Sequence, residues 1–166
     1  MPDPDRADPG AATLAVPRPA VRWWVWPALG WWLLRVATAA ALGIDAVVHW
    51  QNASAYDAVI ATITQGELFR VEAAAAVVTG LLVLVRPRPS SWVAALLVGA
   101  SALAAVVLYR YVDLGSLGPL PDMYESTWQV PGKLLSAYAE GAAVLLAGWG
   151  LLTATRTPEA VRTKRG

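Results

Sequence analysis

Asp45 and His49 are the residues whose types and spacing most clearly suggest chemistry. They stand four positions apart, so on a helix a carboxylate and an imidazole share one face. Such a pair can bind a divalent metal ion when other ligands join it, and Glu72 and Glu140 could supply them. Because His49 is the only histidine and no paired Glu-x-x-His motif occurs, the sequence favours a hydrogen-bonded histidine and no metal.

Other ionisable side chains and tyrosines lie within or beside apolar segments. The candidate polar residues are Asp45, His49, Glu67, Arg70, Glu72, Tyr109, Arg110, Asp113 and Glu140. An ionised group at the centre of a bilayer costs about 2.5–3.5 kcal/mol on insertion scales, so such groups normally face each other or a wet cavity. We expect Arg70 or Arg110 to pair across helices with one of the buried carboxylates, and Glu67 to pair locally with Arg70. These residues form either an electrostatic clasp or a site for a ligand, a proton or an ion, and the sequence leaves both open.

The segment between residues 113 and 133 combines turn-forming residues with apolar ones. Prolines and glycines fix turns, while large apolar side chains can anchor the segment on a surface. This mixture suggests an ordered lid over one end of the molecule, although a loop lying at a membrane surface would have the same composition. The lid candidates are Pro119, Pro121, Asp122, Tyr124, Glu125 and Trp128.

The elements that must position these residues are apolar. Of the 166 residues, 57% are hydrophobic and 15% are charged, against roughly 45–50% and roughly 25% in soluble domains. A chain this small cannot bury so much apolar surface within itself, so the excess is expected to face lipid. Apolar segments cover about residues 24–48, 68–85, 91–112 and 134–155, each long enough to cross a bilayer. We therefore predict an all-α, integral membrane four-helix bundle over residues 22–155.

Basic residues predict its orientation. Arg86 and Arg88 lie between the second and third segments, and residues 156–166 form a basic tail, whereas the other two connections are acidic. Cytoplasmic loops carry the excess of Lys and Arg, so both termini should be cytoplasmic, including a flexible arm at residues 1–21. A cleavable signal peptide is the weaker alternative, because Arg35 interrupts its apolar run and apolar sequence continues to Val48. The ratio of eleven Arg to two Lys, with abundant Ala, suggests a GC-rich bacterium, and the expected location is therefore a bacterial inner membrane.

Small residues and tryptophans predict how the helices pack. Each segment contains two small residues four apart, which let membrane helices approach closely. These pairs are Ala39 and Gly43, Ala76 and Gly80, Ala95 and Gly99, and Ala137 and Gly141. The tryptophans near the cytoplasmic ends should form an interfacial belt. They are Trp23, Trp24, Trp26, Trp31, Trp32 and Trp92.

Several functions are excluded or left open by the same residues. There is no cysteine, no phosphate-binding loop and no Gly-x-Ser-x-Gly nucleophile motif, and a net charge of +1 gives no case for nucleic acid. The leading hypothesis is a non-enzymatic accessory subunit or small-ligand binder without a cofactor, whose partners are the lipid bilayer and either other membrane subunits or a second copy. The alternatives are a redox subunit that binds a quinone through Tyr109, Tyr111, His49 and Glu140, and a small proton-coupled transporter.

A family resemblance rests on the first three segments. The motifs are Arg35 followed by small residues, Gly43 and His49, then Glu72 and Gly80-Leu-Leu-Val-Leu, then the basic turn at residues 86–89. Over roughly residues 33–108 the chain resembles the DoxX-like group of small bacterial four-helix membrane proteins. The resemblance implies the four-helix fold and a link to quinone redox complexes, without assigning a role to any residue. From Tyr109 onward the chain departs from that pattern and looks more like other actinobacterial membrane proteins of similar size.

Overall fold

The computed structural model describes residues 25–155, and it is built from four long helices. They are α1 (Val25–Ala53), α2 (Gln65–Val85), α3 (Pro89–Tyr111) and α4 (Lys133–Thr155), with a short 3-10 helix, η1 (Ser54–Tyr56), after α1. All four α-helices are long and apolar enough to cross a membrane. The all-α four-helix prediction is confirmed, while the expected arm at residues 1–21, the tail at 156–166, and Trp23 and Trp24 lie outside the described residues.

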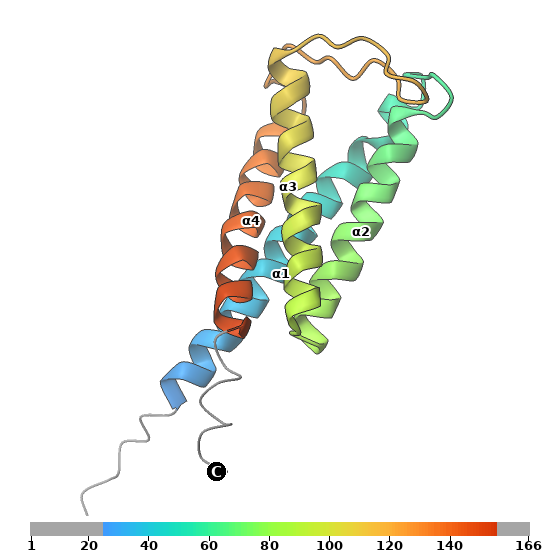
Figure 1. Cartoon of the computed structure of the whole chain (residues 1–166). Helices are drawn as coiled ribbons and strands as arrows, with labels where there is room; N and C mark the ends of the chain where they lie inside the picture. Colours follow the sequence, from blue (N-terminus) through green and yellow to red (C-terminus); the bar gives the residue numbers. More distant parts are fainter. Residues whose placement is uncertain (1–24, 156–166) are drawn as a thin grey trace, which may run out of the picture.

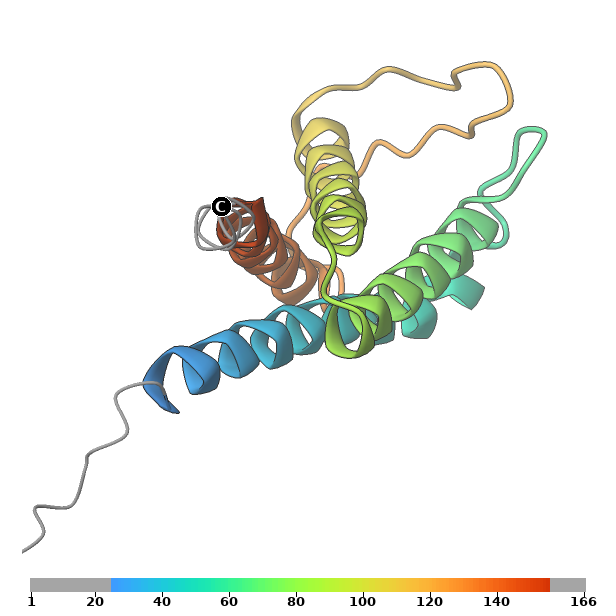
Figure 2. The ribbon, with the colours of Figure 1, turned by 60° about the horizontal axis from the view of Figure 1, so that its bottom comes forward.

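The helices run up and down and are not equally close to one another. The helix α1 packs along both α2 and α4, and α3 packs along α4. The helices α2 and α3 meet at the short turn of residues 86–88 and diverge away from it (Figures 1 and 2). We call this the turn end, and the opposite end, which carries residues 54–64 and 112–132, the loop end. The start of α1 and the end of α4 both lie at the turn end.

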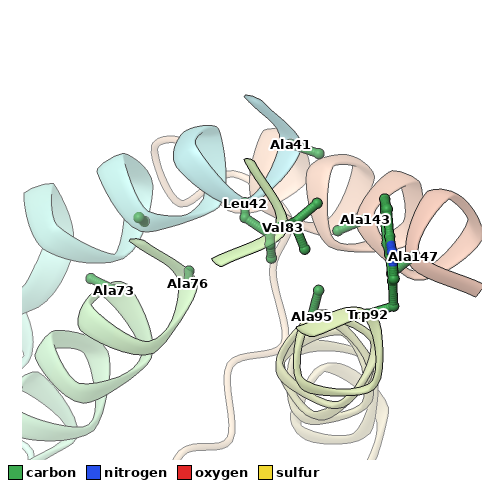
Figure 3. Packing of buried hydrophobic residues seen from close by; sticks show 10 residues of the cluster. Ala41, Leu42, Ala73, Ala76, Val83, Trp92, Ala95, Ala143 and Ala147 are labelled. Carbon is green, nitrogen blue, oxygen red and sulfur yellow. The ribbon is translucent and has the colours of Figure 1, made fainter. Parts of the chain in front are cut away.

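The largest buried apolar side chains lie in the half of the bundle nearer the turn end, and buried alanines such as Ala46 and Ala73 continue the core toward the loop end. Leu42 of α1, Val83 of α2 and Trp92 of α3 are fully buried in the turn-end half, beside small residues of α4 (Figure 3). A Cβ on Gly150 would overlap the Trp92 ring, so the glycine is what lets this ring lie flat against α4. The expectation that Trp92 belongs to an interfacial belt is wrong, because a close approach of α3 and α4 takes its ring into the core.

Small residues bring the helices together at some of the expected positions. Gly80 lies against Ala39 and Leu42 of α1, and Gly99 lies against α4 near Ala143. The expectation for Gly43 and Gly141 is wrong, since a Cβ at either position would meet nothing within 4 Å and neither glycine is needed for a close approach of helices. On α4 the buried face carries Ala139, Ala143 and Ala147 in place of the expected pair. Many alanines fit the four-residue spacing, so the pattern alone could not select the face.

Arg35 is the only charged residue in the described part of α1 that lies in its turn-end half. Its Nε donates to the Val83 carbonyl at 3.1 Å, near the C-terminal end of α2, and its guanidinium lies 4.1 Å from the centre of the Trp32 ring. The partial negative charge of a helix C-terminus and its free carbonyls favour a cation there. Arg35 therefore joins α1 to α2 at the turn end. It does not contact the polar residues nearer the loop end.

Candidate ligand site at the loop end

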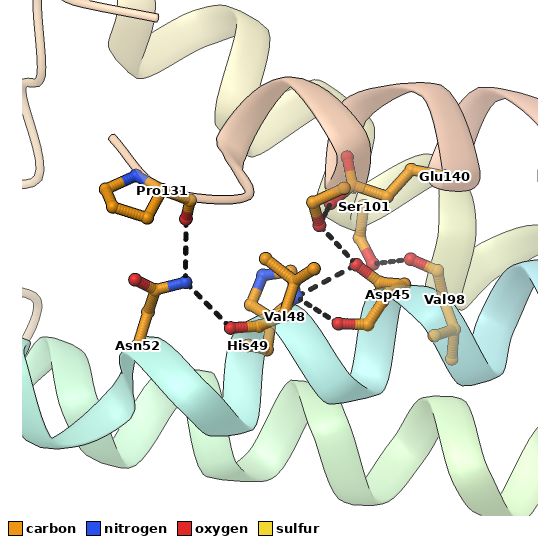
Figure 4. A network of polar contacts seen from close by, with 9 residues as sticks. Asp45, Val48, His49, Asn52, Val98, Ser101, Pro131 and Glu140 are labelled. Carbon is orange, nitrogen blue, oxygen red and sulfur yellow. Dashed lines mark hydrogen bonds and ion pairs between the residues drawn. The ribbon is translucent and has the colours of Figure 1, made fainter. Parts of the chain in front are cut away.

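Asp45 and His49 of α1 meet Ser136 and Glu140 of α4, and we call these four residues the acid cluster. His49 Nδ1 lies 2.9 Å from Asp45 Oδ1, and Ser136 Oγ lies 2.7 Å from that same oxygen and 2.9 Å from Glu140 Oε1. Figure 4 shows the side chains of Asp45, His49 and Glu140 directed toward one another between the two helices. The one-turn spacing of 45 and 49, and of 136 and 140, places each pair on one helix face.

The acid cluster is deeply buried and not fully hydrogen-bonded. Asp45 is 0% exposed and Glu140 is 1% exposed. Asp45 Oδ2 and Glu140 Oε2 are buried without a hydrogen-bond partner. Burying a polar group without a partner is costly, and burying an uncompensated charge costs more. These two oxygens are therefore places where a proton, a cation or a ligand group would be stabilising.

A cavity of about 430 Å³ opens beside the acid cluster, between the diverging helices α2 and α3. His49, Ser136 and Glu140 line one part of it, and Glu72 lines the α2 side. Most of the remaining lining is apolar or aromatic and comes from α1, η1, α2, α3 and the loop of residues 112–132, whereas α4 contributes only Lys133, Ser136 and Glu140. The arrangement of apolar walls with a few convergent polar groups is typical of a small-molecule site.

The acidic residue Glu72 differs from the acid cluster in having no partner at all among residues 25–155. Its Oε1 is buried without a hydrogen bond, although the side chain is only partly buried. Glu72 and Glu140 each lie about 10 Å along their helices from the residue that begins them, at the rise of 1.5 Å per residue. The cavity therefore has carboxylates at a similar depth on two helices.

The loop of residues 112–132 is tied to the helices at several points and covers the cavity. The carbonyl of Pro119 accepts from the backbone N–H groups of Thr62 and Ile63, each at 3.3 Å, and the Glu125 N–H donates to the Tyr109 carbonyl at 3.0 Å. Pro121 is among the fully buried side chains. The loop residues Leu120, Met123, Glu125, Val130 and Pro131 line the cavity.

The loop is fixed at its other end beside α1. Asn52 Nδ2 donates to the Pro131 carbonyl at 3.1 Å. Gly132 has φ +79°, a backbone conformation that favours glycine, and a Cβ there would press on Val48. The next residue, Lys133, donates from Nζ to the Glu125 carbonyl at 2.9 Å. The chain therefore enters α4 along a fixed path over α1.

Trp128 anchors the middle of the loop between two cations. The Arg110 guanidinium and the Lys133 ammonium each lie 5.7 Å from the centre of a Trp128 ring. Arg110 also lies 4.9 Å from the centre of the Tyr111 ring. Cations over aromatic faces are attracted by the ring quadrupole. The expectation that Arg110 pairs with a buried carboxylate is wrong, since its guanidinium faces these rings.

Arg70 forms an ion pair that the sequence did not indicate. Its two terminal nitrogens donate to the two carboxylate oxygens of Asp57, both at 2.8 Å. The expected pairing with Glu72, Glu140 or Asp45 is wrong, because the connection after η1 folds back and brings Asp57 to α2. This guanidinium holds the pKa of the Asp57 carboxyl below its usual value. A Cβ on Gly66 would overlap Asp57, so the glycine keeps this approach open.

Glu67 has a local structural role. Its backbone N–H donates to Thr64 Oγ1 at 2.9 Å, and its own carboxylate accepts from the Thr64 N–H at 2.8 Å. This is a capping box, which satisfies free N–H groups at the start of α2. The expected local salt bridge between Glu67 and Arg70 is replaced by this cap.

The structure thus separates the sequence candidates into two groups. Those that line the cavity or lie in the acid cluster are Asp45, His49, Glu72, Tyr109, Glu125 and Glu140. Those that serve the helix ends or the loop are Glu67, Arg70, Arg110, Asp113, Asp122 and Trp128. Asp113 and Asp122 each accept a backbone N–H two residues ahead and fix turns, while Tyr124 is exposed and Pro119 binds the 54–64 connection.

Sequence reasoning missed Ser136, the hydroxyl that joins both buried carboxylates. The signal for it was present, since Ser136 stands four residues before Glu140 on the same helix face. It also missed Asp57, whose signal could not be read without the path of the connection.

No protein-family model, curated protein or solved structure matches this chain. The resemblance to DoxX-like proteins therefore stays a prediction. Function has to be argued from the geometry of the acid cluster and the cavity.

Proposed function

We propose that this protein is a small-ligand binder of a bacterial inner membrane, and that its site is the cavity at the loop end. The observation that carries the proposal is the cavity itself, whose apolar walls surround buried carboxylate oxygens without partners. A ligand with an apolar body and a polar or cationic head fits both parts. Its body would replace solvent along the walls, and its head would meet Glu140, Glu72 or His49.

The proposed orientation puts both termini in the cytoplasm and the loop end outside. It is supported by Arg86 and Arg88 at the turn end and by the acidic connections at the loop end. Cysteines introduced at Ser90 and Ser116, both exposed, test it in this cysteine-free chain. In intact cells an impermeant thiol reagent should label Ser116→Cys and leave Ser90→Cys unlabelled, and the reverse result would overturn the orientation.

A quinone is a ligand class with a specific observation in its favour. His49, Tyr109 and Glu140 all line the cavity, so groups able to hydrogen-bond quinone oxygens surround an apolar space. Tyr111, the fourth residue of that hypothesis, is 65% exposed and lies beside Trp128 instead. The quinone-linked redox subunit therefore remains the second candidate function.

A proton-coupled transporter has less support. Alternating access requires a path from the site to the other side of the membrane. Between the acid cluster and the turn end, the described bundle is filled by Leu42, Ala143 and the rest of the apolar core. The geometry favours a site that opens to one side only.

Extraction of bound small molecules tests the proposal. Ala105 lines the cavity, whereas its neighbour Ala104 is exposed and does not. The full chain and the variants Ala105→Phe and Ala104→Phe would be purified in a mild detergent, and their organic extracts compared by mass spectrometry. We expect one small molecule to accompany the wild type and Ala104→Phe and to be lost from Ala105→Phe. Identical extracts from all three would overturn the proposal.

A further inference from the structure

We propose that Asp45, His49 and Glu140 bind one divalent transition-metal ion of the zinc class, with a coordination position open to the cavity. This goes beyond the small-ligand function and does not depend on it. The three residues each offer one ligand atom, and these atoms all lie within 4.8 Å of one another. Asp45 and His49 come from α1 and Glu140 from α4.

The donor types and spacing suit zinc. Zinc binds imidazole nitrogen and carboxylate oxygen at roughly 2.0–2.2 Å, so ligand atoms around a tetrahedral ion lie roughly 3.4 Å apart. His49 Nδ1 lies 2.9 Å from Asp45 Oδ1 and 3.1 Å from the Asp45 carbonyl, so a metal ion bound at Nδ1 would replace the proton of this hydrogen bond. The Glu140 carboxylate is on a side chain with several rotatable bonds, so it can adjust its position toward the other two ligands. Hard ions such as Mg²⁺ and Ca²⁺ prefer all-oxygen sites, which makes the imidazole selective for the zinc class.

Unpartnered atoms provide an independent reason for a cation. Asp45 Oδ2 and Glu140 Oε2 belong to side chains that are at least 99% buried, and neither oxygen has a hydrogen-bond partner. Carboxylates in such a setting need a proton or a cation close by. Within residues 25–155 the imidazole of His49 is the nearest group able to carry a positive charge, and it contacts Asp45 Oδ1 and not the two unpartnered oxygens. No Lys or Arg there supplies a cation, because the guanidinium of Arg70 binds Asp57 and the ammonium of Lys133 binds the loop.

The Ser136 hydroxyl leads to the same conclusion. It lies within hydrogen-bond distance of one oxygen of Asp45 and one of Glu140, yet a hydroxyl carries a single hydrogen. If both carboxylates are ionised, one of these two contacts joins two acceptors and is repulsive. An ion between the carboxylates removes that repulsion and leaves Ser136 to orient one of them, as residues around a metal ligand set commonly do.

The cavity gives the ion an open position. His49 and Glu140 line it, so the side of the ligand set away from the helix backbones faces the cavity. Three protein ligands with one open position are typical of zinc sites that bind water or a further molecule, whereas purely structural sites have four protein ligands. Glu72 also lines this cavity and would supply a second acceptor there.

Metal binding to the full chain tests this inference. The protein would be purified in a mild detergent, treated with a chelator, and titrated with Zn²⁺ by calorimetry and with Co²⁺ by visible absorption. We expect one equivalent of Zn²⁺ and an intense Co²⁺ band of the kind given by four-coordinate ions. The substitutions His49→Gln, Asp45→Asn and Glu140→Gln should each weaken binding by more than about 100-fold, beyond the roughly 10–100-fold that a residue outside the ligand set costs.

Asp113→Asn, which removes an exposed loop-end carboxylate, is the matched control and should bind like the wild type. Helix content by circular dichroism and size-exclusion profiles show which variants fold. If a variant does not fold, the wild-type Co²⁺ spectrum and stoichiometry decide the question. Absence of stoichiometric Zn²⁺ binding to the folded wild type, or equal binding by folded Asp45→Asn and Glu140→Gln, would overturn the inference and indicate that a proton alone bridges the carboxylates. Ala105→Phe fills the cavity without changing a metal ligand, so it should keep the metal and lose the small molecule, and the two proposals fail separately.

Discussion

The two ends of this bundle use the same four helices for opposite purposes. At the turn end, Leu42, Val83 and Trp92 are fully buried and alanines and glycines bring the helix backbones together. At the loop end, α2 and α3 diverge around a cavity of about 430 Å³, and the buried atoms include carboxylate oxygens without partners. Among the described residues, the unpartnered polar atom of the turn end is the neutral Nε1 of Trp92, whereas the loop end buries carboxylate oxygens that a proton, an ion or a second molecule would stabilise.

The comparison shows where the stability and the chemistry of the protein lie. Lipid offers no hydrophobic drive between helices, so close packing of the turn-end half is what holds them together. A half held firmly by packing allows the other half to keep a cavity and buried acids. Substitutions at the two ends should therefore have opposite effects on stability.

The largest expected effect is at the turn end. Trp92→Ala removes a fully buried ring and should lower the free energy of unfolding by about 3–5 kcal/mol. Denaturant titration in detergent micelles, followed by circular dichroism, measures it. The control is Trp149→Ala, whose ring is 63% exposed and should cost less than about 1 kcal/mol. Equal losses for the two tryptophans would mean that the turn end is not the stable half.

The second effect has the opposite sign. Glu140→Gln replaces a buried carboxylate by a neutral amide that can donate to Asp45, and in chelator-treated protein it should raise the free energy of unfolding by about 1–3 kcal/mol. Glu140→Asp keeps the charge and should give no such gain. Breaking a buried ion pair would instead cost about 3–5 kcal/mol, so a loss of that size would contradict this prediction and show that the Glu140 carboxylate is stabilised by a positive charge.

A smaller effect is expected in the loop. Trp128→Ala removes the ring that lies between Arg110 and Lys133, and each cation contact is worth about 0.5–1 kcal/mol. The loop should then open more often, and limited proteolysis between Gly115 and Gly132 should become faster. Tyr124→Ala, at an exposed ring of the same loop, should change the cleavage rate less. Rapid cleavage of the folded wild type at these residues would show that the loop does not cover the cavity.

The smallest effect concerns the Asp57–Arg70 pair, because both side chains are exposed to solvent. The pKa of Asp57 is lower in the folded protein than in the unfolded chain, because Arg70 stabilises the carboxylate. The pair therefore stabilises the fold above the unfolded pKa of roughly 3.9, and this contribution is lost as the pH falls through the folded pKa. The difference in melting temperature between the wild type and Asp57→Asn should be small at pH 7 and should shrink in this acidic range. A difference that stays constant down to pH 2 would contradict the pairing.

The helix ends differ in how well the sequence alone predicts them. The helix end expected at residue 85 matches the end of α2, because the charged residue Arg86 follows the apolar run directly. The end of α1 was expected at residue 48 but lies at Ala53, since a helix can continue past the apolar run where its polar side chains remain bonded. Asn52, for example, donates to the Val48 carbonyl within the helix.

The residues of the candidate site could be predicted only in part from the sequence. The spacing of Asp45 and His49 placed them on one face, and that local relation holds in the structure. The sequence offered four ionisable candidates to meet this pair, namely Arg70, Glu72, Arg110 and Glu140. Which of them would do so depended on how each helix is rotated. Alanine is so frequent on all sides of α4 that no apolar stripe marked its inner face, and the choice between the faces of Gly141 and Ala143 could not be made.

The sequence by itself determined the number of helices, their apolar character and the local pairs along each helix, because these depend on composition and on a fixed helical repeat. Only the tertiary structure decided that Asp57 takes Arg70, that Trp92 enters the core, and that Asp45, His49 and Glu140 come together beside a cavity. Those outcomes depend on how each helix is rotated and tilted, and small differences in packing between nearly equivalent alanine-rich faces set the rotation.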